Sequence, residues 1–246
     1  MNALNEGINE LELGDKLVRF GQHTSIVTIA SSGSRFINAN MFPRNNTVKL
    51  GDPISLTNGY RGGSSSRAGI AIYNETQLPK GQEDYLDRVA KPYFNAYVAW
   101  LENIKCGMKG YEMFDLIENE LPRNKYGWSL CPEHLIGEEE WMSSPIYKGS
   151  NEQLQSGMLL QIDIIPYVKG YNGVFAESTV LLADKKLQEA IKSQYPDMYQ
   201  RMKDRRTYLI EELGIDLSKD VMPMCSTVAY LRPFLLDHDK AFKVVK

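Results

Sequence analysis

A short sequence pattern occurs twice in this chain, about 100 residues apart. Residues 5–13 and 105–113 each carry a turn glycine followed by a helix-forming stretch, at an offset of 100. Residues 50–56 and 156–162 each carry a glycine turn followed by an apolar run suited to a buried strand, at an offset of 106. Short matches of this kind also arise by chance. If the repeat is real, the chain consists of two related halves.

The rest of the chain mixes helical and strand patterns without regular βαβ alternation. Strands are predicted at residues 25–31, 54–56, 70–73, 158–168 and 173–182, with a Gly/Ser-rich stretch at 59–66 and a hairpin turn at 169–172. Helices are predicted at residues 11–20, 82–104, 111–121 and 184–213, with interruptions at Pro92 and Pro196. Clustered strands between helices indicate an α+β fold.

Composition excludes several classes of protein. A chain of 246 residues can bury a full core without disulfides or structural metals. Its 28 basic and 31 acidic residues are interspersed and sum to −3, which argues against a nucleic-acid partner. The apolar runs are too short to cross a membrane, and the N-terminus does not have the pattern of a secretory signal. Both observations argue against a membrane partner. Three widely spaced cysteines fit a reducing compartment, so a cytoplasmic location is expected.

Seven short segments occur in an order that resembles one known family. They are the turn at Gly7 and residues 28–33, 48–52, 105–108, 132–137, 156–158 and 173–180. This order is similar to that of the pita-bread family, which includes aminopeptidase P, prolidase, methionine aminopeptidase and creatinase. The resemblance implies two pseudo-symmetric α/β halves around a curved antiparallel sheet, formed by residues 1–184. Residues 185–246 are then a C-terminal helical extension packed on this domain.

Active peptidases of this family hold two divalent metal ions with two Asp, one His and two Glu. The resemblance places the first Asp at Thr57 and the second at about Ser64. No carboxylate occurs between Pro53 and Ile72, so a shift in alignment restores neither ligand. The remaining ligands correspond to His134, to Asp163 in place of a Glu, and to Glu177. The substrate-side His falls near Asn40 and a later His falls near Trp141.

The loss of two carboxylates removes the basis of a dinuclear site. Two dications about 3.5 to 4 Å apart need bridging carboxylates to offset their repulsion. Hydroxyl groups at Thr57 and Ser64 carry no such charge. We therefore expect no cofactor, or at most one divalent metal at His134, Asp163 and Glu177. Asp163 is one methylene shorter than the Glu it replaces, which argues against even that site.

Three functions remain open. The leading hypothesis is a peptidase homologue that has lost dinuclear chemistry and binds a peptide or small polar ligand. A second is a metal-independent C–N hydrolase similar to creatinase, with His134 as general acid and base. A third is a mononuclear metallohydrolase using the remaining ligand trio. The predicted ligand cleft contains Asn40, Thr57, Ser64, Arg67 and Tyr171.

Structural roles compete with each functional assignment. The two acidic residues could face solvent on an edge strand, and His134 could be a hydrogen-bonded core residue. A surface ion pair is the alternative for Arg67, and core packing is the alternative for Tyr171. The extension either covers the sheet or forms a homodimer contact. Because family members carry a helix and usually a whole domain before the Gly7 turn, we also expect an N-terminal domain in the full-length protein.

Overall fold

The computed structural model describes residues 1–18, 21–139 and 143–245. Its centre is a seven-stranded sheet in which every pairing is antiparallel, with strand order β1-β2-β3-β6-β5-β4 and β7 paired to β6. The strands are β1 (Ile29–Ser32), β2 (Pro53–Tyr60), β3 (Gly63–Ile70), β4 (Glu133–Leu135), β5 (Leu159–Ile162), β6 (Phe175–Leu182) and β7 (Val221–Pro223). The helices are α1 (Glu10–Leu17), α2 (Gly33–Ile37), α3 (Lys91–Asn103), α4 (Gly110–Glu120), α5 (Arg123–Tyr126), α6 (Lys185–Gln194) and α7 (Pro196–Glu211).

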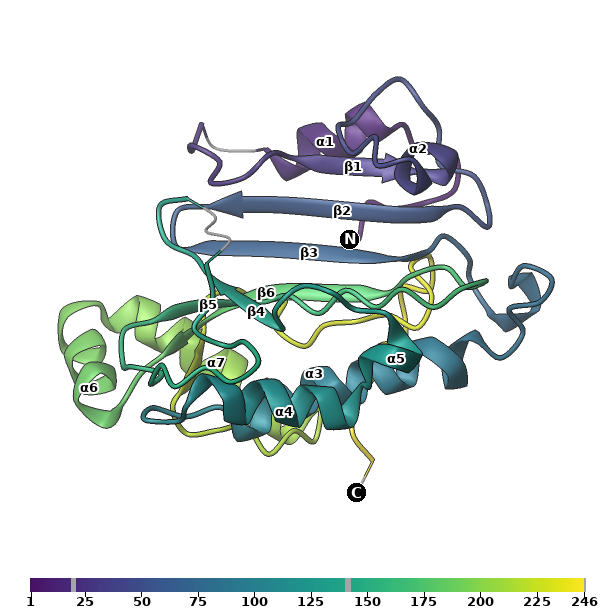
Figure 1. The fold of residues 1–246 in the computed structure, drawn as a ribbon. Helices are drawn as coiled ribbons and strands as arrows, with labels where there is room; N and C mark the ends of the chain where they lie inside the picture. Colours follow the sequence, from purple (N-terminus) through teal and green to yellow (C-terminus); the bar gives the residue numbers. More distant parts are fainter. Residues whose placement is uncertain (19–20, 140–142, 246) are drawn as a thin grey trace.

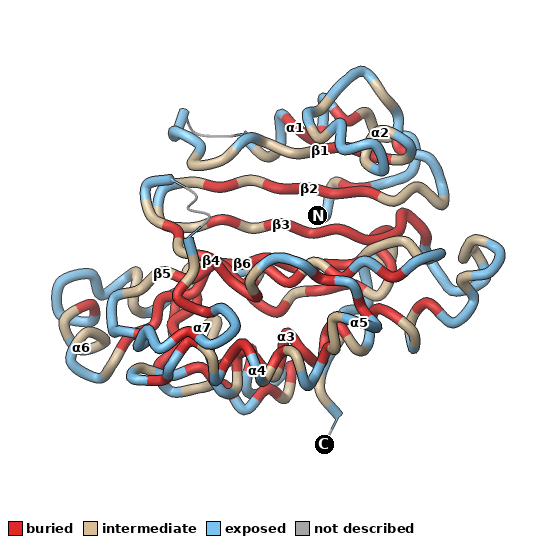
Figure 2. The backbone as a smooth tube through the Cα atoms, viewed as in Figure 1, coloured by how far each residue is buried: buried red, intermediate tan, exposed pale blue. Residues whose placement is uncertain are grey.

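The helices lie in three groups, one of which consists of α6 and α7, which pack on each other. In Figure 1, α1 and α2 lie beside β1, whereas α3, α4 and α5 lie at the opposite side of the sheet. Figure 2 shows that the central strands are almost continuously buried, while the loops and the outer sides of the helices are exposed. None of the helices in the described part of the chain is long and apolar enough to cross a membrane. The predicted α+β class is confirmed.

The backbone hydrogen bonds confirm the two related halves. Gly7 N–H donates to the carbonyl of Val48, and Gly107 N–H donates to the carbonyl of Leu154, at the offsets of 100 and 106 seen in the sequence. Both glycines have positive φ, 84° and 85°, which only glycine adopts readily. In each half the turn leads into a helix, α1 or α4. The repeated pattern therefore marks a repeated structure.

The Gly/Ser-rich stretch at 59–66 is part of the sheet, in contrast to the prediction that it lies between strands. β2 continues to Tyr60 and β3 begins at Gly63, so only a two-residue turn separates them. Gly59 is required here because a Cβ would lie 2.5 Å from Ile26 Cγ2. Pairing of β3 with both β2 and β6 outweighs the low strand propensity of these small residues.

Residues 163–174 form no strand, so the long hairpin predicted at 158–182 is wrong in its central part. β5 ends at Ile162 and β6 begins at Phe175. Pro166 lies in the segment between them, and proline cannot donate a hydrogen bond to a ladder. The helical prediction at 82–104 is closer, because a π-helical turn (Leu86–Ala90) runs directly into α3 with Pro92 near its start.

The C-terminal segment is more than a helical extension. After α6 and α7 the chain adds β7 to the sheet and then crosses beneath β3, where Leu235 N–H donates to the carbonyl of Ile70. Leu235 and Leu236 are buried in one cluster with Leu4 and Leu13 of the first half. Residues beyond 184 thus complete the core of the domain that precedes them.

Candidate functional site

Strand alternation gathers most of the predicted site residues on one face of the sheet. Thr57 pairs with Ser66, Ser66 with Glu177, Gln161 with Thr179, and His134 with Gln161. Ser64 is two residues from Ser66 and shares its face. We call this the polar face, formed by Thr57, Ser64, Ser66, His134, Gln161, Glu177 and Thr179. Asp163 lies just beyond β5, and its Oδ2 is 3.9 Å from Nε2 of His134.

The polar face is buried and internally hydrogen-bonded. Thr57 Oγ1 and Ser66 Oγ are 2.5 Å apart. Gln161 Nε2 donates to Ser64 Oγ at 3.4 Å and to Glu177 Oε2 at 3.5 Å. Its Oε1 accepts from Thr179 Oγ1 at 2.6 Å. Gln161 therefore links the Glu177 carboxylate to the hydroxyl groups of Ser64 and Thr179.

The charged residues of this site are buried rather than solvent-facing. Asp163 and Glu177 are each 7% exposed, so the alternative of an exposed edge strand is wrong for both. His134 is 4% exposed, with Nδ1 3.0 Å from the carbonyl oxygen of Leu135. If Nδ1 carries the proton for that bond, Nε2 faces Asp163 as a proton acceptor. This pair can orient a proton, but it also fits a hydrogen-bonded core histidine.

Glu133 precedes His134 in β4 and lies on the opposite face of the sheet. It is 1% exposed, its Oε1 accepts from Ser144 Oγ, and its Oε2 has no hydrogen-bond partner. Burial raises the pKa of Glu133 to about 7 because the ionised form loses its hydration. This carboxyl is therefore largely protonated below neutral pH and does not add a fixed charge to the polar face.

Arg67 does not lie in the predicted cleft. It is one residue from Ser66, so its side chain points to the face opposite the polar face. It is 2% exposed, which also rules out the surface ion pair. Its guanidinium donates to the carbonyls of Ser66 and Glu177 and to the C-terminal segment at Thr227 and Tyr230. Arg67 joins two parts of the fold.

Two other predicted cleft residues make contacts elsewhere. Asn40 is exposed just beyond α2, where its carbonyl accepts from Ser31 Oγ at 2.6 Å. Tyr171 Oη donates to Asp84 Oδ1 at 2.6 Å, a pairing that ties the loop before β6 to the segment before α3. Trp141 lies outside the described residues. Of the predicted cleft, only Thr57 and Ser64 lie on the polar face.

Three members of the polar face were absent from the sequence predictions. Ser66, Gln161 and Thr179 are each two residues from a predicted site residue on the same strand or its direct extension. Residues at this spacing point to the same side of a strand. Gln161 could have been found from Asp163 by this rule, whereas its bond to Ser64 across the sheet could not.

The donor set of the polar face does not fit a dinuclear metal centre. Hydroxyl groups stand at Thr57 and Ser64, where the family resemblance places carboxylates, and both are engaged in hydrogen bonds. Over residues 1–18, 21–139 and 143–245, no group of three or more His, Cys, Asp and Glu is placed to hold a metal ion. The trio of His134, Asp163 and Glu177 is not assembled as a ligand set in this arrangement.

Comparison with solved structures identifies the architecture. A Xaa-Pro dipeptidase from Bacillus anthracis matches with a TM-score of 0.59 and 21% identity, covering 75% of this chain and 53% of that one. An X-Pro aminopeptidase from Thermotoga maritima matches with a TM-score of 0.58 and 19% identity, covering 75% and 53%. This chain has the pita-bread fold. A prolidase from Pyrococcus furiosus shares that pita-bread fold at a TM-score of 0.57 and 21% identity, covering 74% and 55%.

The similarity is one of fold. The sequence identities to these peptidases are about 20%. At this level the similarity shows a shared fold, and it does not transfer their activities to this chain. No protein-family model and no curated protein matches the chain. The chain spans about half the length of the solved structures that it matches. What the pita-bread fold does in this protein depends on the polar face described above.

Proposed function

We propose that this chain is a non-hydrolytic pita-bread domain that binds a peptide or small polar ligand. The observation that carries the proposal is the hydrogen-bond network on the polar face, in which Gln161 joins Ser64 and Thr179 to Glu177, together with the hydroxyl group of Thr57 where the family resemblance places a carboxylate. A peptide ligand is favoured because the solved structures that share the fold are named as Xaa-Pro peptidases.

Charge balance is the physical reason. Two dications together carry four positive charges, and among the described residues the carboxylates at and beside the polar face are Glu177 and Asp163. These two carboxylates offset half of that charge, and water and hydroxyl ligands leave the other half uncompensated at residues that are more than nine-tenths buried. The Thr57–Ser66 and Gln161 hydrogen bonds would also have to break before these oxygens could turn to a metal.

The test combines metal analysis with a peptidase assay. Purified protein is incubated with Mn²⁺, Co²⁺ or Zn²⁺, freed of loose ions and examined for bound metal and for cleavage of Ala-Pro and longer Xaa-Pro peptides. We expect less than about 0.1 metal per chain and no cleavage above the metal-free rate. Binding of the same peptides is measured by calorimetry.

Matched variants make the outcome specific. Glu177→Gln keeps the size of the side chain and removes its charge, so it should weaken binding of the peptide's positive amino group. Glu120→Gln, at the exposed end of α4, serves as the control. Metal-dependent turnover at an ordinary enzymatic rate would refute the proposal, and so would equal peptide affinity in the wild type and Glu177→Gln.

A metal-independent hydrolase is the second candidate, and the His134–Asp163 pair favours it. Nδ1 of His134 lies against the carbonyl of Leu135, and Nε2 faces the carboxylate of Asp163. This arrangement suits proton transfer. Guanidino and amidino compounds are the substrates to assay. Turnover that disappears in His134→Ala would favour this candidate over the non-hydrolytic domain, and absence of turnover in the wild type would reject it.

A further inference from the structure

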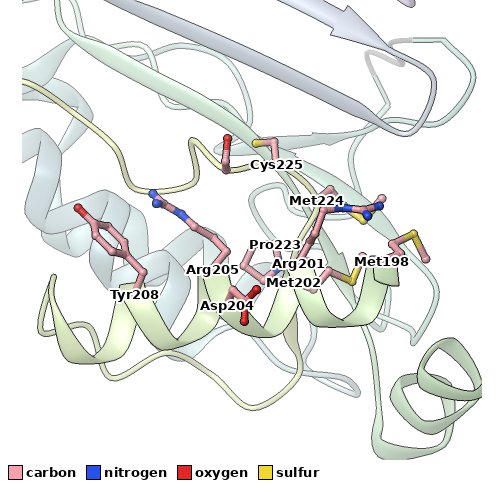
Figure 3. Close-up of a pocket in the computed structure, with 10 residues that line it drawn as sticks. Met198, Arg201, Met202, Asp204, Arg205, Tyr208, Pro223, Met224 and Cys225 are labelled. Carbon is pink, nitrogen blue, oxygen red and sulfur yellow. The ribbon is translucent and has the colours of Figure 1, made fainter. Parts of the chain in front are cut away.

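A cavity lies away from the polar face, between α7 and the segment that follows β7. Figure 3 shows side chains from both segments pointing into it. The cavity has a volume of about 610 Å³ and shares no lining residue with the polar face. This volume is in the range of small-molecule sites. Its apolar part is contributed mainly by Met198, Met202, Pro223 and Met224.

The apolar part of this cavity is adaptable. Methionine side chains are unbranched and polarisable, so they adjust to ligands of different outline. Pro223 ends the sheet strand β7 and Met224 follows it directly, which gives that side of the cavity a fixed base. Such a lining suits an apolar body of variable shape rather than a sugar or a nucleotide, which would need several directed polar partners.

The polar part is cationic, and its charge is not balanced by a carboxylate bonded to it. Arg205 Nη2 donates to the carbonyl of Val228, and its guanidinium carbon lies 4.6 Å from the ring centroid of Tyr208. Its Nε is buried and has no hydrogen-bond partner among the described residues. Within the part of the chain that the structure describes, Arg205 forms no salt bridge.

Two nearby groups bear on this charge. Burial lowers the pKa of Arg205, because the cation loses hydration, and the neighbouring Arg67 acts in the same direction. Asp204 also lines the cavity, but it is exposed and its Oδ1 accepts from Gln200 Nε2 at 2.7 Å. Arg201 adds a second guanidinium at the exposed rim. The cavity therefore joins an apolar wall to two cations, one of them partly desolvated.

We propose that this cavity binds a monocarboxylate with an apolar body, with the carboxylate at Arg205 and the body against the methionines. A guanidinium presents paired N–H donors that match the two oxygens of a carboxylate. Such a ligand would supply the anionic partner that Arg205 lacks. The site is separate from the polar face and does not depend on the function proposed for that face.

The test uses an acid and its neutral analogue on the intact chain. Binding of 4-phenylbutanoate and of 4-phenylbutanamide is measured by calorimetry in the wild type. We expect the acid to bind at least about tenfold more tightly than the amide, because only the acid forms the charged pair. Equal affinities, or no binding of either compound at millimolar concentration, would overturn the proposal.

Single charge removals on one helix locate the site. Arg205→Gln should weaken binding of the acid by about fivefold or more and leave binding of the amide unchanged. Lys203→Gln removes the same charge from an exposed position on α7 that does not line the cavity, so it should bind the acid as the wild type does. Because Arg205 also holds Val228, the comparison of the acid with the amide in the wild type decides the result if Arg205→Gln does not fold. An equal loss in Lys203→Gln and Arg205→Gln would show only general charge attraction and overturn the site.

Discussion

Arg67 is 2% exposed, and its guanidinium donates to carbonyls and one hydroxyl rather than to a carboxylate. It bonds to Ser178 Oγ at 3.0 Å and to backbone on β3, β6 and the C-terminal segment. A buried cation of this kind is tolerated only when its donors are satisfied. Its main role is therefore to hold residues 227–230 against the sheet.

Replacing Arg67 by Met should destabilise the fold strongly. The substitution keeps much of the apolar stem but leaves several buried carbonyls without donors, at a cost of about 3 kcal/mol or more. Urea unfolding followed by circular dichroism measures the change. Arg61→Met, at the exposed turn of the same hairpin, should change stability by less than about 0.5 kcal/mol. Similar losses in the two variants would contradict the role of Arg67.

Residue alternation determines how much of the site was predictable. The family resemblance assigned Thr57 and Ser64 to the site, and the strands bring them onto one face with Glu177. Arg67 was misplaced, although it stands an odd number of residues from Ser64 and so belongs to the other face. Tyr171 was misplaced because its partner, Asp84, is 87 residues away. Nothing in the local sequence signals a contact at that distance.

At the scale of elements, the two halves use the start of their equivalent helices differently. Glu10 opens α1, is fully buried, and accepts from Ser32 N–H at 2.8 Å and from Arg35 Nε at 3.1 Å. Gly110 opens α4 at the matching position, where a Cβ would lie 1.9 Å from the carbonyl oxygen of Pro145. In the first half, the Glu10 carboxylate binds the neighbouring segments at the start of the helix. In the second half, the backbone at Gly110 packs directly against the backbone of Pro145.

Gly110→Ala is the test of this close approach. Alanine favours helix formation over glycine by up to about 1 kcal/mol, so propensity alone predicts stabilisation. The contact with Pro145 predicts instead a net loss of about 3 kcal/mol, because the opposing atom is backbone and cannot rotate away. Thermal unfolding distinguishes the two. Gly63→Ala is the control, since nothing lies within 4 Å of its Cβ, and an unchanged melting temperature in Gly110→Ala would show that the close approach is absent.

At the scale of the whole molecule, the C-terminal segment completes the core of the first half. Leu235 and Leu236 are buried in one cluster with Leu4 and Leu13. The sequence repeat predicted the two halves, but it held no information about a distant segment that completes one of them.

Removal of residues 227–246 should therefore abolish cooperative folding. The truncation deletes the partners of Arg67 and uncovers the cluster around Leu4. Size-exclusion chromatography with light scattering and a denaturant titration report the result. Truncation of 245–246 is the control, because Val245 is 84% exposed, and it should leave both measurements unchanged. A stable, cooperative product from the longer truncation would contradict this role of the C-terminal segment.

The contact between the first and last parts of the chain also sets an order in time. Arg232 Nη1 donates to the carbonyl of Met1, and His238 Nε2 lies 2.9 Å from the carbonyl of Leu4. During synthesis the first half leaves the ribosome long before these residues exist, and contacts so distant in sequence form slowly. Its apolar cluster must stay uncovered until residues 232–238 have been made. The half made first is thus the last to become stable, and in the cell it is the part most in need of protection by a chaperone.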